Sequence, residues 1–309
     1  MVPAGNRSSR CAPECYALYG HLIATRERPL VDAHCHEKRE LQMETLTLAA
    51  KVEFVTTPPK VFVVGSTIPN LAAFGDYLAY RGENWTSIDD EAFNQHDPAT
   101  VSEWAGRVCY MSFSNAKSRV RERYLQESIL SHKHGSVIEH VSFNMLCADV
   151  PRDIQLEFVR HRAGTGYSWE STRFTDKHLR FVVPPRLRDN PEAERIFREG
   201  ILRQVESYDA LRRLAESEGD EGTLKRKRMK EAARGFLPGC RASDGMITLN
   251  ARAARHIIGL RTGEHADLGI REFAYEIYIA LKATAPAFFA DADERDVPDG
   301  PPEVTFGNG

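Results

Sequence analysis

The segment from residue 160 to residue 174 concentrates side chains that can bind an anionic ligand. Arg160-His161-Arg162 precedes the loop Ala163-Gly164-Thr165-Gly166, and the segment Tyr167-Ser168-Trp169-Glu170-Ser171-Thr172-Arg173-Phe174 follows. Guanidinium forks bind phosphate, glycines let the backbone approach a ligand closely, and an aromatic ring can stack on a base. The segment therefore predicts a nucleotide site, although an isolated basic triplet more often marks a solvated helix end beside a flexible loop.

Three further motifs lie before and after this segment. They are His134-Gly135-Ser136-Val137-Ile138-Glu139-His140, Ala233-Arg234-Gly235-Phe236-Leu237-Pro238, and Asn250-Ala251-Arg252 continuing to Leu260-Arg261 with His265 beyond. In order and spacing, the four motifs together resemble the signature of the flavin-dependent thymidylate synthases (ThyX). The resemblance rests on their combination over residues 100–285, because no single motif is specific.

The resemblance implies an enzyme that adds a one-carbon unit to C5 of a uracil nucleotide. It implies FAD as the cofactor, with NADPH and methylenetetrahydrofolate as co-substrates. The residues expected to bind the flavin are His134, Ser136, Glu139, Arg160, His161, Arg162, Asn250, Arg252 and His256. The residues expected to bind the nucleotide are Glu157, Trp169, Glu170, Ser171, Thr172, Arg173, Arg234 (supplied by another subunit) and Arg261.

The catalytic residue implied by the resemblance is Arg261, which would face the uracil edge. A fixed guanidinium there favours the ionised pyrimidine ring and makes C5 more nucleophilic. In this family no enzyme cysteine attacks the base, so the cysteines after residue 100 are expected to be small packing residues. Two of the flavin residues have simpler interpretations, because Asn250 could be a helix cap and Glu139 could form a surface ion pair.

Several residues depart from the family pattern around the nucleotide. The loop after Arg162 is one residue longer, Trp169 stands where a carboxylate or amide is common, and His256 replaces an asparagine. Glu157 occupies a position where the family usually has glutamine. Its carboxylate could accept a hydrogen bond from a sugar hydroxyl. Alternatively, Glu157 is an exposed helix residue and Gln155 is the equivalent of the family's glutamine. With these departures the chain resembles the UMP C5-methylases of polyoxin-type nucleoside-antibiotic biosynthesis. UMP is therefore favoured, with conversion of dUMP to dTMP as the alternative.

Functions of other classes remain open at this point. The basic runs 180–188 and 225–228 are compatible with RNA binding, but they lack interleaved aromatic residues, and a solvated helix face is favoured for the second run. A flavoprotein on the same scaffold that only oxidises NADPH is a further alternative. The net charge of −3 gives no nucleic-acid signature. No apolar run is long enough for a membrane segment and no secretory signal is evident, so we expect a cytoplasmic protein.

Cysteine and histidine residues near the N-terminus raise the question of a metal. Six cysteines are too few for a disulfide framework in 309 residues. Cys11, Cys15, His34, Cys35 and His36 could supply zinc ligands, but their spacing fits no common zinc finger. An irregular surface segment with incidental thiols is favoured, and no metal is expected.

The motifs are expected in a mixed α/β (α+β) domain. We expect an N-terminal extension over residues 1–50, a catalytic domain over 51–290, and a flexible tail over 291–309 that is acidic and rich in proline and glycine. Periodicity predicts strands at 60–65, 141–150 and 179–184, and helices at 101–108, 118–132, 151–162, 191–216, 225–236, 249–260 and 270–282. The resemblance adds a ThyX-like fold, a twisted sheet with a helical half, assembled as a homotetramer with its sites between chains.

Overall fold

The computed structural model describes residues 52–83, 96–113, 124–172, 179–217, 228 and 231–307. The expected N-terminal extension, with the cysteines and histidines considered as zinc ligands, lies outside these ranges. So do the expected substrate residue Arg173 and all of the basic run 225–228 except Arg228.

The core of the described chain is an antiparallel sheet of four strands in the order β2-β3-β6-β4. The strands are β2 (Lys60–Ser66), β3 (Ser142–Pro151), β6 (Ala242–Asn250) and β4 (Thr165–Trp169). Successive side chains of a strand point to opposite faces, so the apolar alternation along β3 predicts one buried face. Phe143, Met145 and Cys147 are buried, whereas Leu146 between them is exposed.

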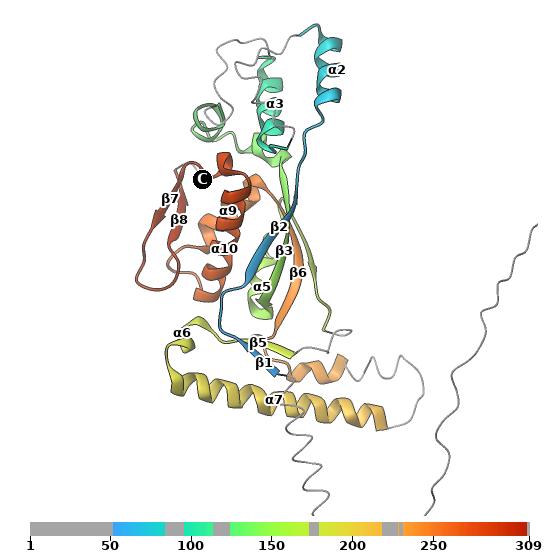
Figure 1. Cartoon of the computed structure of the whole chain (residues 1–309), viewed down its shortest axis with the longest axis vertical. Coiled ribbons are helices and arrows are strands. Elements are labelled where there is room, and N and C mark those ends of the chain that lie inside the picture. Colours follow the sequence, from blue (N-terminus) through green and yellow to red (C-terminus); the bar gives the residue numbers. More distant parts are fainter. Residues whose placement is uncertain are drawn as a thin grey trace, which may run out of the picture. The chain divides into compact units, whose positions relative to one another are not determined.

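Helices α9 (Ala251–Arg261) and α10 (Leu268–Thr284) cover the buried face of this sheet (Figure 1). Ile257 of α9 and Ile277 of α10 belong to the same apolar core as the inward residues of β3 and β6. Helix α9 begins directly after β6, with Asn250 as the last residue of the strand and the N-cap of the helix. This junction fixes the position of α9 relative to the sheet.

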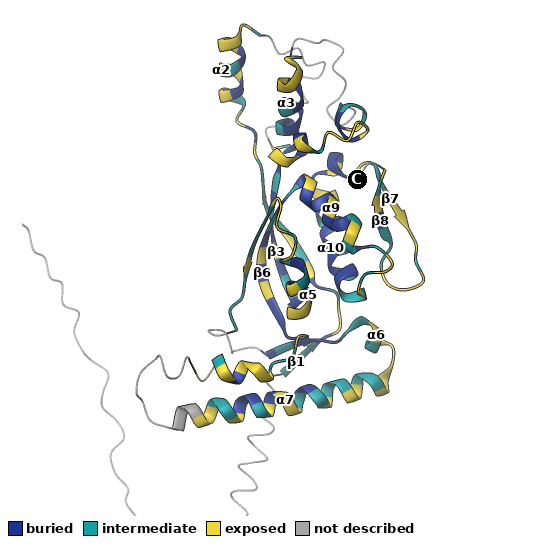
Figure 2. Cartoon of the chain, turned by 180° about the vertical axis from the view of Figure 1, so that it is seen from behind, coloured by how far each residue is buried: buried dark blue, intermediate teal, exposed yellow. Residues whose placement is uncertain are grey.

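A second layer is formed by β1 (Val52–Val55) and β5 (Leu179–Val182), which pair in parallel. Helix α7 (Pro191–Ser217) follows the short helix α6 (Pro185–Arg188) and lies beside this pair (Figure 1). Ile201 and Val205 of α7 pack against Phe181 of β5. The helix predicted over 191–216 is confirmed, and its apolar stripe faces the strands (Figure 2).

The other helices include α2 (Leu71–Arg81) and α3 (Ala99–Tyr110), which share a small apolar cluster. Phe74 of α2 stacks on Trp104 of α3 with ring centroids 4.0 Å apart. The remaining helical elements are η2 (Leu125–Leu130), η3 (Gly135–His140), α5 (Arg152–Phe158), η4 (Arg234–Phe236) and η5 (Pro286–Phe288).

Two strands of the sheet, β4 and β6, are not predicted by the periodicity of the sequence. Strand β4 occupies the segment expected as a loop and its continuation, and β6 precedes a helix expected to begin at Leu249. Gly166 and Gly245 interrupt the strand pattern, because glycine has no side chain to pack. Strand β4 also lies at the edge of the sheet, with no fully buried residue.

The segment 291–309 was expected to be a flexible tail, and this is wrong for residues 292–306. Strand β7 (Ala292–Arg295) and strand β8 (Glu303–Phe306) form an antiparallel hairpin. Val304 is buried and joins the main core. The proline and glycine residues of this segment lie in and near the turn of the hairpin. Their abundance therefore marks a turn between two strands and not a flexible tail.

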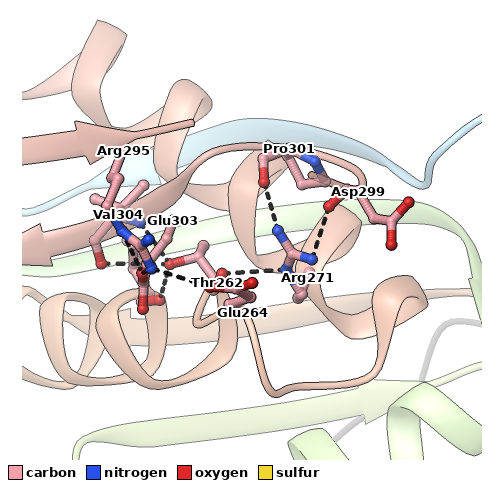
Figure 3. A network of polar contacts seen from close by, with 9 residues as sticks. Thr262, Glu264, Arg271, Arg295, Asp299, Pro301, Glu303 and Val304 are labelled. Atoms are coloured by element: carbon pink, nitrogen blue, oxygen red, sulfur yellow. Dashed lines mark hydrogen bonds and ion pairs between the residues drawn. The ribbon is translucent and has the colours of Figure 1, made fainter. Parts of the chain in front are cut away.

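Side chains from α10 and from the end of α9 hold this hairpin (Figure 3). The buried guanidinium of Arg271 donates to the carbonyl oxygens of Asp299 at 2.8 Å and of Pro301 at 2.7 Å. Oγ1 of Thr262 accepts a hydrogen bond from the backbone N–H of Val304 at 2.9 Å. These long-range contacts order the C-terminal segment and are not visible in its own sequence.

Candidate functional site

The N-terminal end of α9 contacts the loop after Arg162. Oδ1 of Asn250 accepts a hydrogen bond from the N–H of Ala253 at 2.8 Å, and the backbone N–H of Asn250 donates to the carbonyl oxygen of Gly164 at 2.8 Å. Gly164 has a φ of +69°, and a Cβ at this residue would lie 2.5 Å from Nδ2 of Asn250. Glycine is therefore required there. Asn250 is a helix cap, and its flavin contact stays a prediction.

The segment around η3 lies against the same end of α9. A Cβ on Gly135 would lie 3.0 Å from Nε of Arg252, and Arg252 forms an ion pair with Glu139. Both side chains of the pair are about half exposed. Such surface pairs contribute about 0–1 kcal/mol, so a phosphate can replace the carboxylate at little cost. Ser136 follows Gly135 in η3.

The C-terminal end of α9 carries Arg261, which contacts two other expected site residues. Its Nη1 donates to Oε2 of Glu157 at 2.9 Å, and its Nε donates to Nε2 of His161 at 2.9 Å. His161 therefore accepts at Nε2 and carries its proton on Nδ1. The rings of His161 and His256 lie 6.1 Å apart between centroids. Burial, with the charges of Arg261 and His256, lowers the pKa of His161, which keeps the imidazole a neutral acceptor at neutral pH.

A cavity of about 460 Å³ opens beside α5 and β4, and we call it the first cavity. Its volume lies in the range typical of small-molecule sites. Its lining residues are Arg152, Gln155, Leu156, Val159, Trp169, Glu170, Ser171, Thr172 and Arg234. All of the described residues expected to bind the nucleotide, apart from Glu157 and Arg261, are therefore brought together in it. Arg152 belongs to none of the four motifs; its backbone N–H donates to the carbonyl oxygen of Arg241, just before β6, and only this tertiary contact reveals its position.

Gln155 and Glu157 have different surroundings, although they lie two residues apart on α5. Gln155 is buried and lines the first cavity, and its Nε2 donates to the carbonyl oxygen of Val150 at 2.8 Å and to Oγ of Ser243 at 2.6 Å. The Glu157 side chain is 45% exposed and does not line the cavity of its own chain. Glu157 instead forms an ion pair with Arg261.

Trp169 is fixed by close packing on the neighbouring strand. It pairs with Gly245 across β4 and β6, and a Cβ on Gly245 would lie 2.1 Å from Cε3 of the indole. Gly245 therefore leaves the space that the indole occupies. The tryptophan that departs from the family pattern thus forms one wall of the first cavity.

Comparison with known proteins assigns the chain to a family. Residues 92–287 match the family model described as Thymidylate synthase complementing protein. The flavin-dependent thymidylate synthase of Mycobacterium tuberculosis (strain H37Rv) is 35% identical over 251 residues, which cover 79% of this chain and 94% of that protein. The chain belongs to the flavin-dependent thymidylate synthase family. The family member of Mycobacterium avium (strain 104) is 36% identical over 236 residues, covering 74% of this chain and 91% of that protein.

Solved structures of a UMP/dUMP methylase and of a flavin-dependent thymidylate synthase share the fold of this family member. One is the UMP/dUMP methylase PolB from Streptomyces cacaoi bound with 5-Br dUMP, with a TM-score of 0.55, 22% identity, and coverage of 77% of this chain and 95% of that chain. Another is ThyX from Helicobacter pylori with FAD and dUMP, with a TM-score of 0.52, 18% identity, and coverage of 75% and 98%. The expected mixed α/β fold of ThyX type, with a twisted sheet and a helical half, is confirmed.

In this thymidylate synthase relative, the described residues expected to bind the nucleotide form two groups within one chain. Arg261 and its contacts form one group at the end of α9, and the first cavity forms the other. Arg160 and Arg162 are exposed in the segment that joins α5 to β4. Arg234, expected from another subunit, lines the cavity of its own chain beside Thr172.

The thiols of the enzyme are poor nucleophiles where they are buried. Burial raises the pKa of Cys147 to about 12 and that of Cys240 to about 12. Both therefore stay protonated at neutral pH, and a thiol is a much weaker nucleophile than a thiolate. Cys147 packs into the core of the sheet, as expected for a small apolar residue.

The basic run 180–188, considered as an RNA-binding segment, is engaged with carboxylates. Arg180, Arg186 and Arg188 each lie within 2.9 Å of an acidic side chain. Their partners are, in order, Asp149 with Asp244, Asp299, and Glu272. These guanidiniums neutralise acidic groups of the same chain.

Two negative findings apply to the part of the chain that the structure describes. No helix in it has the length and apolar character needed to cross a bilayer. Among the same residues, no three histidine, cysteine or acidic side chains gather as metal ligands.

Proposed function

We propose that this enzyme methylates C5 of a uracil mononucleotide, with UMP favoured, using FAD as cofactor and methylenetetrahydrofolate and NADPH as co-substrates. The observation that carries the proposal is the first cavity, in which hydroxyl and guanidinium groups face the same space as an indole. Family membership and four motifs with the right order support the same chemistry.

The first cavity offers complementary groups for each part of a mononucleotide. Arg152 and Arg234 present N–H forks suited to a phosphate, and the hydroxyls of Ser171 and Thr172 add donors. Trp169 supplies a flat apolar surface for the base. Glu170, also in the lining, can accept hydrogen bonds from sugar hydroxyls.

The residues expected to bind FAD fit a dinucleotide in their chemistry. Arg160, Arg162 and Arg252 are exposed cations, as a pyrophosphate requires, and only a weak ion pair holds Arg252. The remaining residues assigned to this role are His134, Ser136, Glu139, His161, Asn250 and His256. When bound, the flavin supplies the redox and one-carbon transfer chemistry, and the protein supplies orientation and charge.

Arg261 stabilises negative charge on the uracil edge. Its guanidinium is held from two sides, by Glu157 and by His161, so it needs little reorganisation when charge develops. His161 in its neutral form accepts the hydrogen bond from Nε of Arg261 and so orients the guanidinium without adding a second positive charge. The N–H groups on the far side of the fork are directed to the substrate in this proposal.

The preference for UMP is assigned to Glu157. A carboxylate can accept several hydrogen bonds, so Glu157 can bind a ribose 2′-hydroxyl while it holds Arg261. Deoxyribose offers no such donor. The fold neighbour PolB is described as a UMP/dUMP methylase, which shows that this fold accommodates both sugars in that protein.

A homotetramer would bring the two groups of site residues together. Phe62, Leu146 and Met246 form an exposed apolar row across three strands of the sheet. Contiguous apolar surface of this kind is typical of protein interfaces. We expect a molar mass of four chains by light scattering, and Leu146→Glu to lower both the mass and the activity. A monomeric wild-type protein with full activity would contradict this part of the proposal.

One paired assay tests the activity and the sugar preference. Full-length protein is incubated with FAD, NADPH and methylenetetrahydrofolate, and with either UMP or dUMP at equal concentration, and nucleotide products are separated by chromatography. We expect 5-methyl-UMP at a higher kcat/KM than dTMP. Product from dUMP alone would remove the UMP assignment, and NADPH oxidation without either product would leave only the oxidase alternative. Glu157→Gln should lower the UMP to dUMP ratio without abolishing dTMP formation.

A further inference from the structure

A second cavity adjoins the first. It has a volume of about 280 Å³, and its lining residues are Arg152, Thr172, Glu231, Ala232, Arg234, Gly235, Leu237, Pro238 and Arg241. Arg152, Thr172 and Arg234 line both cavities. A group bound to these three residues is therefore in contact with both spaces.

The lining of the second cavity is cationic. It contains three guanidiniums and, among its described residues, the single carboxylate of Glu231. Arg241 is 2% exposed, so its charge is held in an environment where an anion is attracted more strongly than in water. This arginine is unrelated to the four motifs that identify the family.

The backbone around these arginines is fixed. The N–H of Arg241 donates to the carbonyl oxygen of Pro238 at 3.0 Å, and the carbonyl oxygen of Arg241 accepts from the N–H of Arg152 at 3.1 Å. Arg152 and Arg241 are thus joined through their main chains where α5 begins and β6 is about to start. Two arginines that start from neighbouring main-chain positions and line one cavity offer two cations to a ligand with more than one anionic group.

We propose that the second cavity is a phosphate subsite that accepts a phosphate beyond the one held by the first cavity. The ligand class is a uracil nucleoside diphosphate, whose β-phosphate would contact Arg241, or a mononucleotide bound together with inorganic phosphate. The inference rests on the proposed function, because it places the first phosphate of the nucleotide on Arg152 and Arg234. It adds a substrate class, the nucleoside diphosphate, to the mononucleotide.

Substitutions at Gly235 can test this subsite. It lines the second cavity and not the first, and a Cβ added at Gly235 meets no heavy atom within 4 Å. Its φ is not positive, so other residues fit its backbone. Gly235→Glu places a negative charge at the subsite, and Gly235→Gln places a neutral side chain of the same size there.

The experiment measures dissociation constants of UMP and UDP for the full-length protein by isothermal titration calorimetry, with and without inorganic phosphate. We expect UDP to bind about 10- to 100-fold more tightly than UMP, as hydrogen bonds to charged groups predict. Gly235→Glu should abolish this gain, so that the ratio of UMP to UDP dissociation constants falls to about one; any loss through Arg152 and Arg234, which line both cavities, affects UMP and UDP alike and cancels in this ratio. Gly235→Gln should retain most of the gain.

The other outcomes separate the sources of the phosphate and the two proposals. A second result also supports the subsite, with free phosphate as its ligand. In this result UMP and UDP bind with equal affinity, inorganic phosphate binds to the UMP complex, and this phosphate binding is lost in Gly235→Glu. Equal affinity without any phosphate binding overturns the subsite and leaves the proposed function intact. Equal loss of UDP affinity in Gly235→Glu and Gly235→Gln also overturns it, because size and not charge would be responsible. Failure of UMP itself to bind removes both proposals.

Discussion

The contact between Gly245 and Trp169 gives a prediction whose size follows from the structure. A methyl group on Gly245 would lie 2.1 Å from Cε3 of the indole, and an ordinary contact begins at 3.4 Å, so the ring must retreat by 1.3 Å. Gly245 lies in β6 between two paired strands, so the backbone has little freedom to move instead. Overpacking of this kind costs about 1–3 kcal/mol, and we expect Gly245→Ala to lower the free energy of unfolding by this amount.

Displacement of the Trp169 indole should also weaken the binding of UMP. Trp169 lines the first cavity, whereas Gly245 does not, so Gly245→Ala moves the wall without removing any group that touches the nucleotide. Stacking of one base on an aromatic ring contributes about 1–3 kcal/mol, which corresponds to a roughly 5- to 150-fold loss of UMP affinity if stacking is lost. Calorimetric titration with UMP measures this loss.

A double-mutant cycle with Trp169→Leu decides whether the indole is the cause. Leucine leaves room for the added methyl group, so Gly245→Ala should cost less than about 0.5 kcal/mol in the Trp169→Leu background. Urea unfolding at one fixed protein concentration gives the four free energies, since assembly makes stability concentration-dependent. An equal cost of Gly245→Ala in both backgrounds would refute the reasoning, because the methyl group would then disturb something other than Trp169.

Three other predictions concern arginines and a histidine. Arg261→Lys cannot contact Glu157 and His161 as a fork does, so kcat should fall by about 100-fold with a smaller change in KM, measured by initial rates. The pKa of His161 is lowered from its ordinary value of 6.5, so the imidazole takes up its proton only at a lower pH. Its contribution to the free energy of unfolding is complete above pH 6.5 and is lost as the pH falls through the lowered pKa. In His161→Gln, the decrease of kcat at acid pH should be smaller, as measured by a pH profile of initial rates. Arg255→Met leaves Asp291 without its paired guanidinium and should destabilise the fold by about 3 kcal/mol in urea unfolding.

Much of the fold could be predicted where local pattern and tertiary structure agree. The strand predicted over residues 141–150 is β3, one residue later in the chain, at Ser142–Pro151. The helix predicted over 151–162 is the shorter α5, Arg152–Phe158, with Pro151 as its N-cap and not as its first residue. The predicted helix over 249–260 is displaced by two residues at its start, since Asn250 ends β6 and then caps α9. The hairpin of residues 292–306 could not be predicted, because Arg271 and Thr262 order it from a distance.

The site was predictable in composition more than in arrangement. Arg234 lies 62 residues after Thr172 in the chain, and yet it lines the same cavity as Ser171 and Thr172, although it was expected from another subunit. Arg152 and Arg241 were missed because each is an isolated arginine whose importance depends on the contact between α5 and the start of β6. Glu157 was expected at the nucleotide, and its ion pair with Arg261 is visible only in three dimensions.

The hairpin at the C-terminus has a practical consequence for anyone who handles this protein. Thr262 directly follows Arg261, and the hydrogen bond from Val304 to Thr262 joins β8 to the C-cap of the helix that carries the guanidinium proposed to face the uracil. Removal of residues 296–307 by a protease, or their replacement during cloning, would therefore loosen that end of the helix. Affinity tags belong at the N-terminal end, and loss of activity on storage is best checked first by intact-mass spectrometry for clipping near Gly300.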